Sequence, residues 1–126
     1  MTIPHGHHDH THSHGDGHGH DRQHGFNVDS LRNNDLLYRD VYRQVIDWLS
    51  IPPGANVIEA GCGAGGVTQL LADAVAPTGG MITAFDESPE MIEATRELIE
   101  RGANAGVVRY QQGDISKLPF EPGSFD

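Results

Sequence analysis

The chain has 126 residues, room for at most one domain, and its eighteen Asp and Glu against eight Lys and Arg give a formal net charge of −10. The acidic excess lies in residues 28–126, where fifteen acids stand against seven bases, so we expect neither nucleic acid nor an anionic membrane as a partner. The single cysteine excludes an internal disulfide and favours a cytoplasmic location. The sequence has no apolar run of membrane-spanning length and no signal-peptide core.

Residues 1–27 have a low-complexity composition that cannot form a core, so we predict a disordered arm. The arm contains all nine histidines of the chain: His5, His7, His8, His10, His12, His14, His18, His20 and His24. Neutral imidazoles interleaved with aspartates suit transition metals such as Zn²⁺, Ni²⁺, Co²⁺ or Cu²⁺. We therefore name these histidines as candidate metal ligands, beside the alternative of a solubilising segment that binds metal incidentally.

Residues 28–50 are predicted to form a helix that ends near Leu49, with Asp29 or Ser30 as its N-cap. Apolar residues recur at helical spacing and are expected to be buried: Leu37, Val41, Val45, Trp48 and Leu49. Polar residues fall largely on the other side and are expected to face solvent: Arg39, Asp40, Arg43 and Asp47. A Pro-Pro-Gly turn then separates this helix from the rest of the chain.

Three short apolar runs follow and are predicted to be strands: residues 56–60, 81–85 and 107–111. A helix is predicted at about 65–76, and another begins after Ser88 as N-cap, with Pro89 at its first position. This alternation of strands and helices predicts a parallel α/β sheet with right-handed crossovers.

The turn after the first predicted strand is rich in glycine: Val57-Ile58-Glu59-Ala60-Gly61-Cys62-Gly63-Ala64-Gly65-Gly66. A strand, a glycine turn and a helix in this order are typical of a sheet that holds a nucleotide-like ligand at the carboxyl edge of its strands. Gly61, Gly63 and Gly66 also fit the dinucleotide fingerprint, so a fragment of an NAD-dependent oxidoreductase is one alternative. Glu59 favours a ligand with an ammonium group, because its carboxylate would repel a pyrophosphate.

Acidic residues stand at the carboxyl ends of all three predicted strands: Glu59, Asp86 and Asp114. These ends share one edge in an open parallel sheet, so we expect the three side chains to line a single crevice. Asp86 stands where a carboxylate can accept hydrogen bonds from both hydroxyls of a ribose. A role as a solvated loop residue is the alternative, and it is stronger for Asp114 than for Asp86, since Ser88 already caps the following helix.

About residues 35–126 closely resemble the class I S-adenosylmethionine-dependent methyltransferases of the small-molecule type. The resemblance rests on three motifs: Val57 to Gly65 as the family's E/D-x-G-x-G-x-G, Ile82-Thr83-Ala84-Phe85-Asp86-Glu87-Ser88-Pro89-Glu90-Met91, and Gln112-Gly113-Asp114-Ile115-Ser116-Lys117-Leu118-Pro119-Phe120. The second and third motifs in this form are not shared with dehydrogenases. The family resemblance implies a Rossmann-like parallel sheet, incomplete here, with three strands and the start of a fourth at Phe125 and Asp126.

By this resemblance, the first motif would hold the methionine end of S-adenosyl-L-methionine. Glu59 would contribute its carboxylate. The turn would contribute its backbone at Gly61, Cys62, Gly63 and Gly65.

The other two motifs would hold the adenosine end of the cofactor. Asp86 would bind the ribose hydroxyls, with Glu87 beside the adenine. Asp114 would accept a hydrogen bond from the adenine amino group while Ile115 packs on the ring, and Gly113 belongs to the same cofactor-binding set.

The resemblance implies methyl transfer from S-adenosyl-L-methionine to a small-molecule acceptor. A general base, where one is needed, must come from the acceptor side, so the sequence names no catalytic residue. We expect residues 51–126 to be the cofactor-binding half of a longer domain, inactive alone. A metal-binding protein that acts through the histidine-rich arm is a further alternative.

Overall fold

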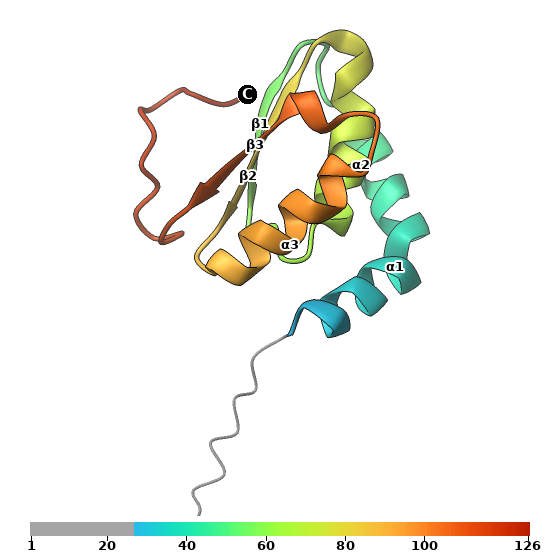
Figure 1. Cartoon of the computed structure of the whole chain (residues 1–126). Helices are drawn as coiled ribbons and strands as arrows, with labels where there is room; N and C mark the ends of the chain where they lie inside the picture. Colours follow the sequence, from blue (N-terminus) through green and yellow to red (C-terminus); the bar gives the residue numbers. More distant parts are fainter. Residues whose placement is uncertain (1–26) are drawn as a thin grey trace, which may run out of the picture.

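The computed structural model describes residues 27–126, whose elements follow the predicted order (Figure 1). The helices are α1 (Val28–Leu49), α2 (Gly66–Val75) and α3 (Pro89–Glu100), with two short 3₁₀ turns at Ala76–Thr78 and Ala105–Val107. The strands are β1 (Asn56–Ala60), β2 (Met81–Asp86) and β3 (Val108–Gln112). The histidine-rich arm and its nine candidate metal ligands lie outside the described residues.

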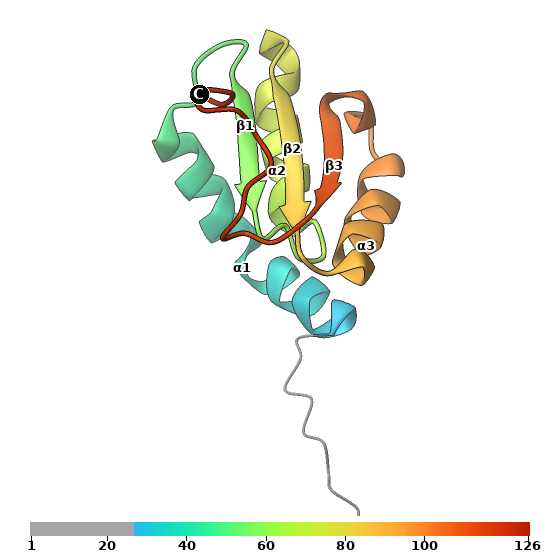
Figure 2. The same ribbon diagram turned by 90° about the vertical axis from the view of Figure 1, so that its left-hand side faces the viewer.

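The three strands form one parallel sheet with β2 in the middle (Figure 2). Val57 of β1 pairs with Ile82 of β2, which pairs in turn with Val108 of β3. Helices α2 and α3 lie on the same face of the sheet, as right-handed crossovers require, and α1 packs on α2 and α3 (Figure 1). The parallel α/β sheet predicted from the sequence is therefore confirmed, and its strands end at one shared edge.

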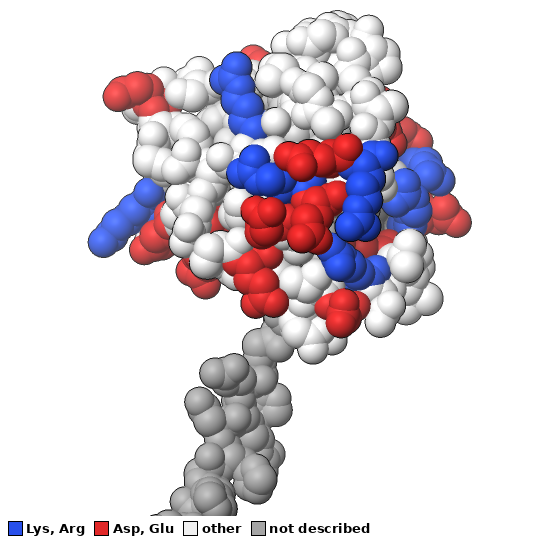
Figure 3. Space-filling view, viewed as in Figure 1, with Lys and Arg blue, Asp and Glu red and all other residues white. Residues whose placement is uncertain are grey.

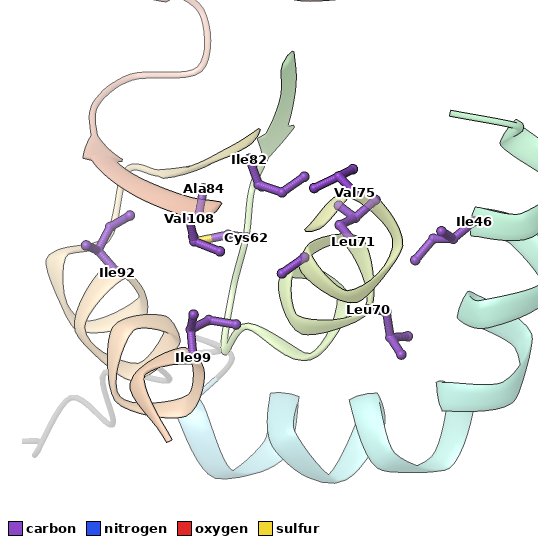
Figure 4. Close-up of a cluster of buried hydrophobic side chains, with 11 residues drawn as sticks. Ile46, Cys62, Leu70, Leu71, Val75, Ile82, Ala84, Ile92, Ile99 and Val108 are labelled. Atoms are coloured by element: carbon purple, nitrogen blue, oxygen red, sulfur yellow. The ribbon is translucent and has the colours of Figure 1, made fainter. Parts of the chain in front are cut away.

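The main core lies between the sheet and its helices (Figure 4). Val75 of α2 and Ile82 of β2 are 1% and 0% exposed, and Ile99 of α3 packs in the same cluster. Each such aliphatic side chain contributes roughly 1.5–3 kcal/mol when removed from water, so this layer fixes α2 and α3 against the sheet.

The opposite face of the sheet is covered by the segment after β3 (Figures 1 and 2). Phe120 packs edge-on against Phe85 of β2, with 6.0 Å between ring centroids, and against Phe125 at 4.9 Å. The segment then reaches the free edge of β1, where the Asp126 amide donates to the Asn56 carbonyl oxygen at 2.9 Å. The sheet therefore carries its helices on one face and an aromatic loop on the other.

Helix α1 begins at Val28, the first residue of the predicted range, but the predicted N-cap is wrong. Asn27 is the N-cap, since its side-chain oxygen accepts from the Ser30 amide at 2.8 Å. Asp29 and Ser30 lie inside the first turn instead. Asn caps a helix about as well as Asp or Ser, so Asn27, just before the predicted range, carried the signal for this start.

The side of α1 that was predicted to be buried is exposed. Its members have between 48% and 81% of their surface exposed: Leu37, Val41, Val45, Trp48 and Leu49. The helix packs on α2 and α3 through a different stripe, whose members are buried or half-buried: Leu31, Asp35, Arg39, Tyr42 and Ile46. Arg39, predicted to face solvent, donates to the Gln69 side chain of α2 at 3.2 Å. Both rows of residues have helical spacing, so spacing alone does not tell which one faces inward. The row that does face inward also makes polar contacts with α2.

The outer surface of α1 and α3 mixes acidic and basic side chains (Figure 3). Arg32 of α1 pairs with Glu97 of α3 at 3.7 Å, and Arg96 pairs with Glu93 within α3 at 3.6 Å. Exposed pairs of this kind contribute at most about 1 kcal/mol each. The position of α1 therefore depends mainly on its buried stripe.

Candidate functional site

A tight glycine loop joins β1 to α2, and bonds to β2 fix its backbone. The amides of Gly61 and Cys62 both donate to the Phe85 carbonyl oxygen, at 2.7 and 3.0 Å. Gly61, Gly63 and Gly65 have φ angles of +85°, +55° and +92°, which L side chains rarely adopt. The path of this loop therefore depends on glycine at these three positions.

Asp86 ends β2 and holds the glycine loop and α3 together. One carboxylate oxygen accepts from the Gly63 amide at 3.0 Å, and the other accepts from the Ser88 amide at 2.9 Å. The Ser88 hydroxyl oxygen accepts from the Met91 amide at 3.3 Å, which confirms Ser88 as the N-cap of α3. Because a carboxylate oxygen accepts at more than one position, each oxygen of Asp86 retains capacity for a further hydrogen bond.

Asp86 also lines an open pocket of about 250 Å³ at the carboxyl edge of the sheet. The other lining residues are Gly61, Phe85, Glu87 and Ile115. A Cβ added to Gly61 would meet no atom within 4 Å, so the loop leaves open space beside the carboxylate. Ile115, 56% exposed, gives the pocket an apolar wall. The arrangement suits a ligand that joins hydroxyl groups to an apolar ring.

Glu59 lies apart from this pocket and packs against α2, where the Thr68 hydroxyl donates to its carboxylate at 2.6 Å. Burial raises the pKa of Glu59 to about 7; the Thr68 bond lowers it, and the charges of Asp35 and Asp86 raise it further. Glu59 is therefore close to half protonated at neutral pH. A positive charge at this edge would lower the pKa of Glu59 and favour its ionised form.

We expect Glu59→Gln to stabilise the chain by about 2 kcal/mol at pH 8 and by much less at pH 4.5. The folded state keeps a proton on Glu59 that the unfolded chain releases between pH 4.5 and about 7, so wild-type stability falls as pH rises through that window. Glutamine still accepts from Thr68 and does not titrate. Urea unfolding followed by circular dichroism measures the free energy of unfolding of wild type and variant at each pH. An equal difference between the two proteins at pH 8 and pH 4.5 would contradict an origin in the raised pKa of Glu59.

Cys62 and Gly65 face the interior, beside α3. Cys62 is 5% exposed, and burial raises the pKa of its thiol to about 11, so the thiol is uncharged at neutral pH. The Thr95 hydroxyl of α3 donates to the Gly63 carbonyl oxygen at 2.8 Å, and a Cβ on Gly65 would lie 2.9 Å from the Thr95 Cα. The Cys62 side chain and Gly65 therefore pack on the interior side of the loop, against α3.

The third motif places one of its predicted residues in the pocket and two beside it. Ile115 lines the pocket, whereas Gly113 packs on Phe85, where an added Cβ would lie 2.8 Å from the ring. One Asp114 oxygen accepts from both the amide and the hydroxyl of Ser116, at 2.8 and 2.7 Å, and these bonds hold the pKa of Asp114 below its usual range. Asp114 thus forms a turn in an exposed loop.

Three residues that support the site were not predicted: Asp35, Thr68 and Thr95. The two threonines are 0% exposed on the apolar sides of their helices, and a buried hydroxyl on such a face indicates a nearby acceptor. Asp35 accepts from the Gly66 amide, thirty-one residues further along the chain, and no local pattern indicates that contact.

Among residues 27–126, no three His, Cys, Asp or Glu side chains are grouped closely enough to hold a metal ion. The nine histidines fall before that range, so the metal site on the arm stays a prediction.

A family model described as a methyltransferase domain matches residues 57–126. The nocamycin O-methyltransferase of Saccharothrix syringae is 37% identical over 90 residues, which cover 71% of this chain and 31% of that protein. The 2-phytyl-1,4-naphtoquinone methyltransferase of Synechococcus elongatus is 33% identical over 90 residues, which cover 71% of this chain and 38% of that protein. This chain therefore spans about a third of the length of these relatives.

The structure of a SAM-dependent methyltransferase from Aquifex aeolicus matches with a TM-score of 0.66 and 21% identity, over 81% of this chain and 55% of that one. This likeness shows a shared Rossmann-like fold. The family match runs from the second residue of β1 through β3 and includes the glycine loop and the pocket at its carboxyl edge. The chain therefore belongs to the methyltransferase domain family.

Proposed function

We propose that the carboxyl edge of this sheet binds S-adenosyl-L-methionine and that the protein transfers its methyl group to a small-molecule acceptor. Asp86 carries the proposal, because two backbone amides fix its carboxylate at the border of an open pocket. A ribose presents two hydroxyl donors, and the two Asp86 oxygens can accept one each. Glu87 and Ile115 line the same pocket and would lie beside the adenine.

The charges at this edge fit the cofactor. Asp35 and Asp86 both raise the pKa of Glu59, which indicates an excess of negative charge around the glycine loop. S-adenosyl-L-methionine carries an ammonium and a sulfonium group and no phosphate, so it would relieve the repulsion among these carboxylates. A pyrophosphate would increase that repulsion.

The backbone of the loop also argues against a dinucleotide. A phosphate at a helix N-terminus needs N–H donors that point toward it. Here Gly66, the first residue of α2, already donates to the Asp35 carboxylate at 3.1 Å, and Gly63 donates to Asp86. A carboxylate from α1 thus stands where the fingerprint would place a phosphate, which disfavours the oxidoreductase alternative.

An ammonium group has the opposite requirement, since it donates hydrogen bonds and needs oxygen acceptors. The amides of Gly61 and Cys62 donate within the protein, so they would not serve the cofactor as donors. We therefore propose that carbonyl oxygens of the loop hold the methionine end, with Glu59 supplying negative charge behind them. The expected contribution of the loop backbone would then come from its acceptors.

When bound, S-adenosyl-L-methionine supplies a methyl group on a sulfonium, which is reactive toward in-line displacement by a nucleophile. Asp86 would fix the ribose, while Glu87 and Ile115 would orient the base. Positioning of this kind and exclusion of water are the main catalytic contributions that these residues can make. The names of the two relatives refer to nocamycin and to 2-phytyl-1,4-naphtoquinone, which supports a small-molecule acceptor.

We further propose that residues 51–126 form the cofactor-binding half of the domain, to which residues 28–50 add an N-terminal helix. These parts alone would not transfer methyl groups. We also propose a cytoplasmic location, which is supported by the single, buried cysteine. Within residues 27–126, no helix is both long and apolar enough to cross a membrane.

Isothermal titration calorimetry with S-adenosylhomocysteine tests the proposed cofactor. We expect one molecule to bind per chain of 126 residues, and NAD at the same concentration to release no heat. A thermal-shift series with both ligands is an independent check. Stabilisation by NAD and not by S-adenosylhomocysteine would overturn the proposal.

A further inference from the structure

Helix α2 begins without a capping side chain of its own. Its N-cap residue is Gly65, in the left-handed conformation with φ +92°. The amide of the next residue, Gly66, is one of those at a helix start that have no acceptor within the helix, so it needs one from elsewhere. That acceptor is the Asp35 carboxylate of α1, at 3.1 Å. A residue of the preceding helix thus satisfies one of the amides that the start of α2 leaves without a partner in the helix, as an N-cap side chain does for the second or third helical residue.

The fit between these two residues is close. A Cβ added to Gly66 would lie 2.4 Å from the Asp35 Cβ and 2.5 Å from its Cγ, so the absence of a side chain at Gly66 makes room for Asp35. Burial raises the pKa of Asp35, while the Gly66 amide lowers it. The carboxylate is therefore partly withdrawn from water and directed at the start of α2.

This contact fastens one end of the glycine loop, and Asp86 fastens the other through the Gly63 amide. A second residue of α1 reaches the same loop, since a Cβ on Gly63 would lie 3.4 Å from the Leu31 Cδ1. Helix α1 therefore touches the loop at two positions. It packs there through the stripe that contains Asp35, while its more apolar row stays exposed.

We propose that Asp35 is a positioning residue that couples the packing of α1 to the shape of the Gly61–Gly66 loop. The coupling rests on the proposed function, since the loop is the expected binding site for the methionine end of the cofactor. Binding free energies are linked reciprocally. A cofactor that requires this loop shape therefore favours the packed position of α1, and a displaced α1 weakens cofactor binding.

Three variants of the 126-residue chain separate capping from general packing. Asp35→Ala removes the acceptor for the Gly66 amide, and Asp35→Asn retains an acceptor of the same size without the charge. Arg39→Ala is the matched control, because Arg39 also joins α1 to α2, one turn further along, through Gln69. We expect S-adenosylhomocysteine to bind about tenfold more weakly to Asp35→Ala, and within about threefold of wild type to the other two variants.

Amide hydrogen exchange followed by NMR gives a readout that needs no ligand. We expect Asp35→Ala to accelerate exchange at Gly63 and Gly66 by about tenfold, and Arg39→Ala to leave both amides near their wild-type rates. Equal exchange or equal affinity in Asp35→Ala and Arg39→Ala would overturn the proposed coupling. If the unmodified chain bound no S-adenosylhomocysteine, the proposed function would fail, and the exchange rates alone would decide whether Asp35 holds the loop.

Discussion

Replacing Asp86 by alanine is expected to weaken S-adenosylhomocysteine binding about a hundredfold, because hydrogen bonds to a charged group contribute about 1.5–3 kcal/mol each. The variant loses the carboxylate proposed to accept both ribose hydroxyls. It also releases the Gly63 amide, which donates to Asp86 at 3.0 Å and fixes the loop beside the pocket. Isothermal titration calorimetry measures the change in affinity directly.

Glu90→Gln is a suitable control for Asp86→Ala. Glu90 is an exposed acid in the first turn of α3, so its replacement removes one negative charge from the neighbouring helix end without changing the pocket lining. We expect its affinity to stay within twofold of wild type. Melting curves of both variants report whether the fold is retained. Equal affinities in the two variants would refute the role of Asp86 at the ribose.

The second large effect concerns stability: Gly65→Ala should destabilise the chain by about 3 kcal/mol, and Gly61→Ala by about 1 kcal/mol. Both glycines have φ near +90°, so both variants have the unfavourable left-handed conformation. They differ in the space available. A Cβ on Gly65 would lie 2.9 Å from the backbone Cα of Thr95, whereas one on Gly61 would meet no atom within 4 Å.

Urea unfolding without ligand gives both values, and the difference between the two variants isolates the contact with α3. Because both substitutions restrict the unfolded chain to the same degree, that part of the effect cancels. Similar losses in the two variants would mean that the loop moves away from α3 at little cost.

The sheet was predictable because its signals are local. The apolar runs and turn residues fixed the order of the elements, and Ser88 with Pro89 marked the start of α3. The orientation of α1 was not predictable in this way. Two stripes of the helix have the same spacing, and the inward one contains Asp35 and Arg39, whose partners in α2 lie about thirty residues away.

The sequence predicted that the candidate site lies at the carboxyl edge of the sheet, but not the direction in which each side chain faces. Parallel strands place their carboxyl ends together, which brought Gly61, Asp86 and Ile115 to one pocket. Glu59 is one residue from the end of β1, and it packs on the side of the sheet where Thr68 of α2 donates to it. The position of a residue near a strand end therefore predicts the edge, while strand alternation and helix contacts decide which way it faces.

The most direct test of cofactor binding at this edge is an NMR titration of the chain with S-adenosylhomocysteine. We expect the amide signals of Gly61, Gly63, Asp86, Glu87 and Ile115 to shift together and to saturate at one equivalent. Signals at the far ends of the strands, such as Met81, should stay in place. Saturation with shifts confined to other regions, or no shifts at all, would contradict a binding site for the cofactor at the carboxyl edge of the sheet.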